Sequence, residues 1–255
     1  MDKEVDNEVS NTQFHKDWAH LYDWVYEKSF GDSYKRMTEV SIRTIQGLVQ
    51  SEEPRIADIG AGTGRLTRPL IELGFEVVAI EPSSQMLEVL KPKISGHEDR
   101  VEVINTSMAE FTTTPVDIAV CVFTVFAYLS REDELKRSLR NIARHIKPFG
   151  FFLFDLASDM FFQGGIVMSH SSPELNRETR ITHEAGEVFR LSDKISGQYD
   201  GIAFQHNESF LVRRWEKETV FQLLEENGMN QVEFDDSDFR FTGSRYFLFQ
   251  KGGSK

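Results

Sequence analysis

Short apolar runs separated by amphipathic stretches dominate the chain between residues 55 and 156. The runs lie at residues 56–59, 75–80, 101–104, 116–123 and 150–156. Strands that are covered by helices on both faces have this nearly continuous apolar pattern, because neither face meets water. Helical spacing separates the runs, as in the apolar positions Leu135, Leu139, Ile142 and Ile146. The alternation of strands and helices predicts a Rossmann-like, doubly wound α/β sheet.

Both flanks of this region add further elements to the prediction. An aromatic stripe predicts a helix over residues 14–29, and a second helix is expected near residues 34–50. Near the other end, a helix over residues 215–227 stops at Gly228. Two closing strands are expected at residues 232–234 and 246–250.

The segment 157–214 has a different pattern from the rest of the chain. Its alternating, β-rich runs at residues 178–182, 188–195 and 201–213 predict antiparallel strands. Inserted between the fifth and sixth strands, it would lie over the ligand crevice or form a dimer contact. We therefore expect a disordered tail at residues 1–12, a discontinuous main domain at 13–156 and 215–251, and an inserted substrate cover or dimerisation segment at 157–214.

A glycine-rich turn joins the first predicted strand to the following helix. It reads Gly60-Ala61-Gly62-Thr63-Gly64, and its glycines let the backbone approach a ligand at the helix N-terminus. Glu81 ends the next strand, where a carboxylate can accept two hydrogen bonds from a ribose. A nicotinamide-binding fingerprint would need glycine at the position of Arg65. Asp58 lies inside the first strand and suits a cofactor that carries an ammonium group and a sulfonium.

These residues resemble motif I of the class I S-adenosylmethionine-dependent methyltransferases, which reads D-x-G-x-G-x-G. The resemblance covers about residues 14–249 and implies seven strands, mostly parallel, with the last antiparallel. It also implies S-adenosylmethionine as the cofactor. Many members have Asp where this chain has Ser107, which can still accept a hydrogen bond from adenine. The residues expected to bind the cofactor are Asp58, Gly60, Ala61, Gly62, Thr63, Gly64, Glu81, Pro82, Met86, Ser107, Met108, Ala109 and Phe123.

Candidate residues for the methyl acceptor come from three segments. The sequence AHLYDWVYE resembles an A-x-x-YD-x-x-Y element of many small-molecule methyltransferases, so Tyr22 and Tyr26 are expected to line the site. Tyr128 follows the fourth strand, whose carboxyl end faces the crevice, and is the candidate for orienting the acceptor or taking its proton. The other expected substrate-binding residues are Thr124, Phe161, Phe162 and His206.

The composition of the chain disfavours several classes of binding partner. The net charge of −12 disfavours nucleic acid and anionic membranes, both of which attract basic patches. The single cysteine, Cys121, excludes an internal disulfide, and the scattered histidines predict no metal site. The absence of a signal peptide and of a long apolar run favours a cytoplasmic protein. We expect a small-molecule acceptor and allow for a homodimer.

Two other functions fit parts of the sequence. A non-catalytic S-adenosylmethionine-binding protein would use the same cofactor residues as an enzyme. A nucleotide-dependent oxidoreductase is less consistent with Arg65. The turn after the fourth strand, Phe123-Thr124-Val125-Phe126, lacks the Asn/Asp-Pro-Pro-aromatic motif of adenine and glutamine methylation. The sequence thus favours in-line methyl transfer to oxygen or nitrogen of a small molecule.

Overall fold

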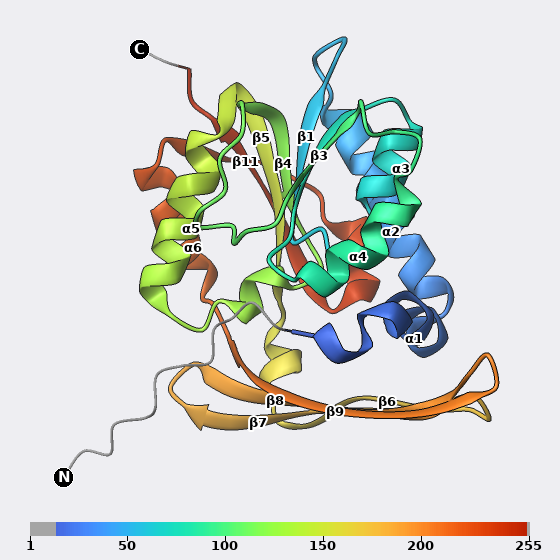
Figure 1. Cartoon of the computed structure of the whole chain (residues 1–255). Helices are drawn as coiled ribbons and strands as arrows, with labels where there is room; N and C mark the ends of the chain where they lie inside the picture. The colour runs from blue at the N-terminus through green and yellow to red at the C-terminus, as the bar shows by residue number, and fades with distance from the viewer. Residues whose placement is uncertain (1–13, 254–255) are drawn as a thin grey trace.

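The computed structural model describes residues 14–253, so the tail expected at residues 1–12 lies outside the described residues. Within them, seven strands form one large sheet in the order β10-β11-β5-β4-β1-β2-β3 (Figure 1). The strands are β1 (Arg55–Ile59), β2 (Glu76–Ile80), β3 (Val101–Ile104), β4 (Val116–Cys121), β5 (Ile146–Ala157), β10 (Met229–Val232) and β11 (Ser244–Lys251).

The direction of these strands confirms the predicted doubly wound sheet. The pairs from β3 through β5 are parallel, and Ile56 of β1 lies opposite both Val77 and Ile118. Strand β11 is antiparallel to both of its neighbours, β5 and β10. The chain reverses through the 3-10 helix η4 (Ser237–Thr242) before β11, which then inserts between the two strands.

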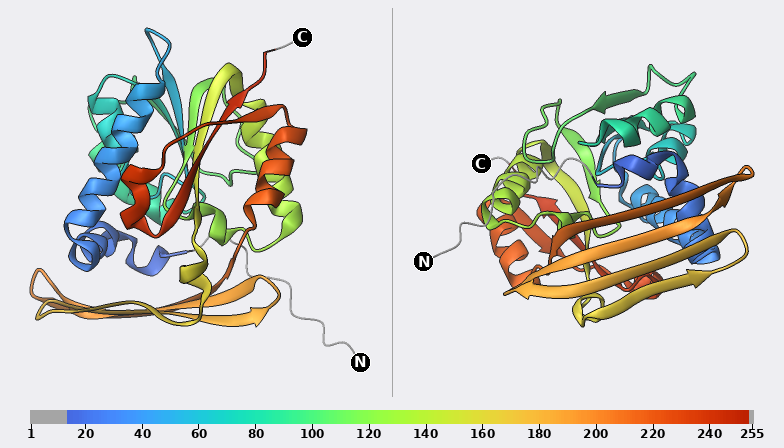
Figure 2. Two further views of the ribbon diagram at one scale, coloured as in Figure 1. Left: turned by 180° about the vertical axis from the view of Figure 1, so that it is seen from behind. Right: turned by 60° about the horizontal axis from the view of Figure 1, so that its bottom comes forward.

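Helices cover both faces of the large sheet (Figure 2). Ile56 and Val77 pack toward the face covered by α2–α4, whereas Ala57 and Val78 belong to the core beneath α5 and α6. This alternation explains the continuous apolar runs of β1, β2 and β4, because both sides of these strands are buried. The helices are α2 (Asp32–Leu48), α3 (Thr67–Glu72), α4 (Ser84–Lys93), α5 (Glu132–Arg144) and α6 (Lys217–Glu226). No helix within residues 14–253 has the length and apolar character needed to cross a membrane.

The single helix expected over residues 14–29 is wrong. The structure has a 3-10 helix, η1 (Lys16–Leu21), followed by α1 (Tyr22–Phe30). The break lies at Trp18, whose φ of −134° and ψ of 21° are not helical. This backbone conformation accompanies burial of the indole, which is 1% exposed and stacks on Tyr22 and Tyr26. Aromatic packing therefore overrides helical continuity here.

The predicted bounds of α5 also need correction. The helical spacing of apolar residues extends to Ile146, but the helix begins at Glu132, without a side-chain cap, and ends before Ile146. Three acidic residues in its first turn offset the helix dipole instead. The helix ends at Arg144, and Ile146 already belongs to β5, paired with Val116.

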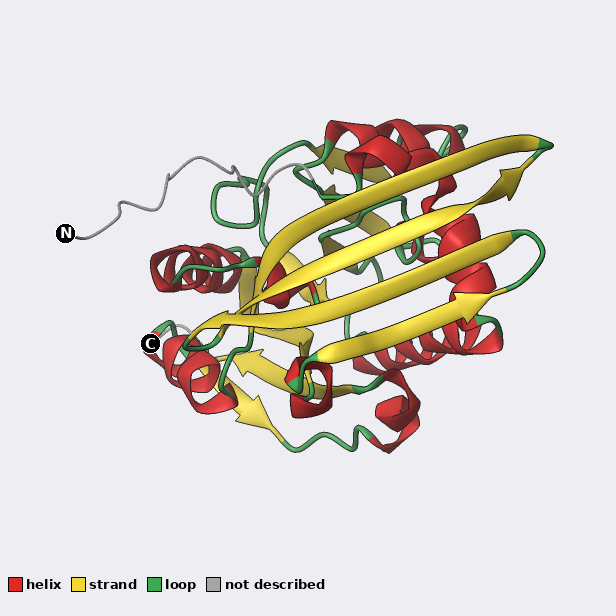
Figure 3. Cartoon of the chain, turned by 90° about the horizontal axis from the view of Figure 1, so that it is seen from below, coloured by secondary structure: helices red, strands yellow, loops and turns green. Residues whose placement is uncertain are grey.

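The residues between β5 and α6 form a second, antiparallel sheet, which we call the cover sheet. It lies across the carboxyl ends of the large sheet's parallel strands (Figures 1 and 3). Alternate residues of its two central strands are buried, including Leu175, Ile181 and Ile195. One of its strands, β6, is missing from the prediction because its seven residues are half exposed and show no clear alternation. The strands are β6 (Gly165–Ser171), β7 (Leu175–Ala185), β8 (Val188–Tyr199) and β9 (Ile202–Arg213), in that order.

Candidate functional site

The glycine turn after β1 is shaped by close packing on one side and open space on the other. Gly60 has a φ of 74°, and a Cβ there would lie 2.8 Å from Cγ1 of Val125. Gly62 has a φ of 54°, and a Cβ there would meet no protein atom closer than 4.0 Å. Only glycine adopts such angles without strain. The turn therefore leaves backbone exposed toward the space beside Gly62.

Glu81 closes the other side of this space at the end of β2. Its carboxylate accepts hydrogen bonds from the N–H groups of Gly62, at 2.9 Å, and Ser83, at 2.8 Å. Burial raises the pKa of Glu81, while these two backbone donors oppose the shift. The side chain is 8% exposed, so its orientation is fixed before any ligand binds.

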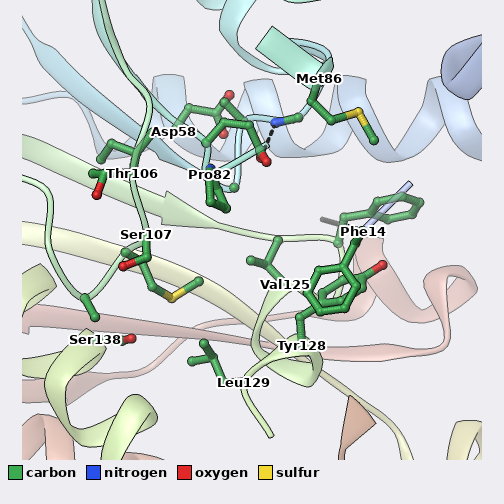
Figure 4. A pocket seen from close by; sticks show the side chains of 18 of the residues that line it. Phe14, Asp58, Pro82, Met86, Thr106, Ser107, Val125, Tyr128, Leu129 and Ser138 are labelled. Carbon is green, nitrogen blue, oxygen red and sulfur yellow. Dashed lines mark hydrogen bonds between the residues drawn. The ribbon is translucent and has the colours of Figure 1, made fainter. Parts of the chain in front are cut away.

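A cavity of about 480 Å³, the first cavity, extends from the glycine turn to η2 (Val125–Tyr128). Figure 4 shows Phe14 and Tyr128 side by side at one end, with Ser107 and Ser138 toward the other. Most residues expected to bind the cofactor line it together: Asp58, Gly60, Ala61, Gly62, Glu81, Pro82, Met86, Ser107, Met108, Ala109 and Phe123.

Two expected cofactor residues do not line this cavity. Thr63 donates its hydroxyl hydrogen to Asp23 at 2.6 Å and so ties the turn to α1. Gly64 packs against Leu90, whose Cδ1 would lie 2.3 Å from an added Cβ. Both residues therefore shape the turn from behind.

The first cavity matches the chemistry of S-adenosylmethionine. A fixed carboxylate, Glu81, suits the ribose hydroxyls, and the thioether side chains of Met86 and Met108 suit a flat aromatic base. The carboxylate of Asp58 also lines this cavity, and Thr67 donates to it at 2.6 Å. Burial raises the pKa of Asp58, and an ammonium group beside it would favour the charged form.

A second cavity, also about 480 Å³, lies between the large sheet's carboxyl edge and the cover sheet. Its lining includes Tyr26, Thr124 and Phe161 among the expected substrate residues. The two cavities share His15, Phe123 and Tyr128 as lining residues. A ligand in the second cavity would therefore border a ligand in the first.

The other expected acceptor residues lie elsewhere. Tyr22 lines the first cavity rather than the second. Phe162 lines neither, and its ring packs against Phe189 at 5.1 Å between centroids. His206 also lines neither and stacks against Phe204 at 6.0 Å. Phe162 belongs to the 3-10 helix η3 (Asp159–Phe162), before the cover sheet, and His206 to β9, and the sequence positions of these two residues do not indicate which way their side chains face.

The turn that separates the two cavities is strained. Phe123 and Thr124 have φ values of 80° and 59°, which residues other than glycine rarely adopt. Both carboxylate oxygens of Asp155 accept the N–H of Thr124, at 2.9 and 3.0 Å. Asp155 thereby holds the turn that places Phe123 between the cavities.

Burial raises the pKa of Asp155 to about 6, against the opposing hydrogen bond from Thr124. The folded protein then binds this proton more tightly than the unfolded chain, so stability is lost as pH rises from about 4 to 6. We therefore compare the free energy of unfolding of Asp155→Asn with that of the wild type. The difference should shift in favour of the variant by about 1–3 kcal/mol between pH 4 and pH 7.5. Urea unfolding at both pH values measures this difference, and equal differences at the two pH values would contradict it.

A three-residue network spans the border of the cavities. His15 has its backbone N–H 3.1 Å from Oε2 of Glu208, and its Nδ1 contacts Oε1 of the same carboxylate. The other ring nitrogen, Nε2, lies 3.0 Å from the Tyr128 hydroxyl. Because a carboxylate only accepts hydrogen bonds, Nδ1 carries the proton of the neutral ring. Nε2 is then the acceptor for the Tyr128 O–H.

Sequence reasoning identified Tyr128 but missed His15 and Glu208. These two residues are 193 positions apart and belong to no motif. It also missed the buried pair Arg177 and Asp193 in the second cavity. The positive φ of His15, 57°, indicates that the fold holds this residue in place at some cost.

Comparisons with known proteins agree with this geometry. The family model described as methyltransferase domain matches residues 56–150. The chain is similar to an uncharacterized methyltransferase of Oceanobacillus iheyensis, at 26% identity over 54% of this chain and 63% of that protein, less than two thirds of its length. It is also similar to the cypemycin N-terminal methyltransferase of a Streptomyces species, at 27% identity over 75% of this chain and 77% of that protein.

Solved structures share the whole fold. A S-adenosylmethionine-dependent methyltransferase of Clostridium acetobutylicum superposes with a TM-score of 0.79, at 18% identity, covering 92% of this chain and 99% of that one. A sugar N-methyltransferase of a Streptoalloteichus species gives a TM-score of 0.71 at 17% identity, covering 99% and 98%. The match over residues 56–150, the fold and the glycine turn lead to one conclusion: the chain contains a methyltransferase domain with the fold of class I S-adenosylmethionine-dependent methyltransferases.

Proposed function

We propose that the chain transfers a methyl group to a nitrogen or oxygen atom of a small molecule held in the second cavity. The observation that carries this proposal is the shared border of the two cavities at His15, Phe123 and Tyr128. A nucleophile at that border would face a cofactor in the first cavity without crossing solvent. Two of the similar proteins are named as N-methyltransferases, which favours nitrogen.

The bound cofactor supplies a methyl group that its sulfonium already activates. The protein therefore has to align the acceptor, exclude water and remove the acceptor's proton. The cover sheet closes the acceptor side, and the strained turn at Phe123 fixes the border. These features provide alignment and exclusion of water.

Proton removal is assigned to Tyr128, His15 and Glu208 acting in series. Burial, with contributions from Tyr26 and Glu208, raises the pKa of Tyr128 well above its usual range, so a free phenolate is disfavoured. The Tyr128 oxygen can instead accept the acceptor's proton while its own proton passes to Nε2 of His15. The resulting imidazolium is stabilised by the Glu208 carboxylate on Nδ1.

A screen of small amines and alcohols tests this function. Release of S-adenosylhomocysteine above the rate of cofactor hydrolysis, together with a methylated product by mass spectrometry, would support it. Tight cofactor binding without product from any amine or alcohol would instead favour a non-catalytic binding protein.

Glu81 offers a direct test of the cofactor assignment. We expect Glu81→Gln to weaken S-adenosylhomocysteine binding at least about tenfold, because each hydrogen bond from a ribose hydroxyl to a charged acceptor contributes about 1.5–3 kcal/mol. Calorimetric titration measures the dissociation constant. Glu88→Gln makes the same charge change at an exposed position of α4 and should leave it unchanged. Equal affinities for the two variants would show that Glu81 does not bind the ribose.

A further inference from the structure

The second cavity contains a buried hydrogen-bond donor that the protein leaves unused. Arg177 lines this cavity and is 5% exposed. Its Nε and Nη2 donate to Asp193, at 3.1 and 2.7 Å. Its Nη1 makes no hydrogen bond of normal geometry within residues 14–253, and the guanidinium lies 4.3 Å from the centroid of the Tyr26 ring. A buried N–H without an acceptor is unfavourable, so an oxygen atom of a ligand in this cavity would stabilise it.

The charge around Arg177 indicates which kind of oxygen would bind there. Asp193 is 1% exposed, neutralises Arg177 and also accepts the Thr179 hydroxyl at 3.0 Å. The pair is therefore already neutral and its carboxylate is fully hydrogen-bonded. A neutral hydroxyl or carbonyl oxygen satisfies Nη1 without adding a buried charge.

The remaining charged groups of the cavity are acidic. Asp155 lines it, and Glu208 lies behind His15 at its border. Arg177 is neutralised by Asp193, and Arg65 lies beside Phe123 and acts on Asp155. The lining of the second cavity therefore offers an anionic acceptor no unpaired Lys or Arg. Arg177 and Arg65 already lie over the rings of Tyr26 and Phe123, at 4.3 and 5.1 Å from the ring centroids. The rings of Tyr128, Phe161 and Phe210 also line the cavity and can attract a further cation. A positively charged amine fits both features.

We propose that the acceptor is an amine that carries neighbouring hydroxyl groups, of the amino-sugar or amino-alcohol class. This inference rests on the proposed methyl transfer. A hydroxyl oxygen accepts from Nη1 of Arg177, and the nitrogen lies at the border beside Tyr128. The ammonium form first loses a proton through Tyr128 and His15. The freed nitrogen lone pair then forms the bond to the methyl carbon as the carbon–sulfur electron pair returns to sulfur. One proton is released overall.

Equilibrium binding to the wild-type protein saturated with S-adenosylhomocysteine tests the proposal without requiring turnover. The probes are methyl glucosaminide, methyl glucoside, cyclohexylamine and glucuronate, which separate amine, hydroxyl and acid. We expect methyl glucosaminide to bind at least about tenfold tighter than methyl glucoside or cyclohexylamine, and glucuronate not to bind. Equal binding of the first two, or preferred binding of glucuronate, would overturn the proposal.

Two variants of the cover sheet test whether the hydroxyl group of the probe binds at Arg177. Arg177→Met should reduce the preference for methyl glucosaminide over cyclohexylamine, because the hydroxyl loses its donor. Arg180→Met, at an exposed position of the same strand, should preserve it. If Arg177→Met fails to fold, two other measurements still test the proposal. One is the order of affinities of the four probes for the wild-type protein. The other is Asp155→Asn, which should weaken the preference for methyl glucosaminide over methyl glucoside.

Product formation separates failure of this inference from failure of the proposed function. Methylation of an alcohol without an amine, or of an acid, would retain the methyl-transfer function and refute the amine class. Tight binding of methyl glucosaminide with no methylated product from any acceptor class would support the site and refute the proposed catalysis.

Discussion

His15→Gln is expected to lower the turnover number about a hundredfold to a thousandfold, the range for losing a positioned proton acceptor. Glutamine is similar in size and can still hydrogen-bond Tyr128, but it cannot take a proton. The dissociation constant of S-adenosylhomocysteine should change little, because Glu81 and the glycine turn remain. Single-turnover methyl transfer with the acceptor from the screen measures the effect.

Coupling between residues distinguishes a relay from a packing role. If Tyr128 and His15 act in series, Tyr128→Phe, His15→Gln and the double variant should lose similar factors. His206→Gln is the matched control, since His206 lies on the same strand as Glu208 but outside both cavities. If the double variant loses the product of the two single-variant factors in turnover number, or if turnover falls in parallel with cofactor affinity, His15 only supports the structure.

Asp193→Ala is expected to reduce the free energy of unfolding by about 3–5 kcal/mol, because it leaves the Arg177 guanidinium buried without its counter-ion. The ion pair joins β7 to β8 on the inner face of the cover sheet, and both side chains are almost fully buried. Thr179 also loses its acceptor. Urea unfolding at neutral pH gives the change.

Glu184→Ala provides the comparison for this prediction. Glu184 pairs with Arg190 on the same two strands, but both side chains are about 40% exposed, so the loss should stay below about 1 kcal/mol. The double variant Arg177→Met/Asp193→Leu should recover most of the stability, since it removes both buried charges. Equal losses for Asp193→Ala and Glu184→Ala would contradict the role of burial.

The parts of the molecule that depend on neighbours in sequence could be predicted. Strands β1, β2, β4 and β5 are recognisable because parallel strands covered on both faces are continuously apolar. The glycine turn and Glu81 fall within one strand–helix–strand unit, so local spacing was sufficient to bring them together. Ser83 likewise caps α4 by accepting the N–H of Met86, as its position suggests.

The acceptor side could not be predicted because it is assembled across long sequence separations. The contact between His15 and Glu208 depends on how the cover sheet lies over the N-terminal segment. The pairing of Arg177 with Asp193 depends on the register of β7 and β8. The break at Trp18 follows from aromatic stacking beneath the same sheet. None of these arrangements leaves a periodic signal in the sequence.

The most direct test of the account is a crystal structure of the complex with S-adenosylhomocysteine and the acceptor identified by the screen. We expect the nucleoside in the first cavity with its ribose on Glu81, and the acceptor in the second cavity. The nucleophilic atom should lie between the cofactor sulfur and the Tyr128 hydroxyl. An acceptor bound on the outer face of the cover sheet, or a nucleophile remote from Tyr128, would contradict the account.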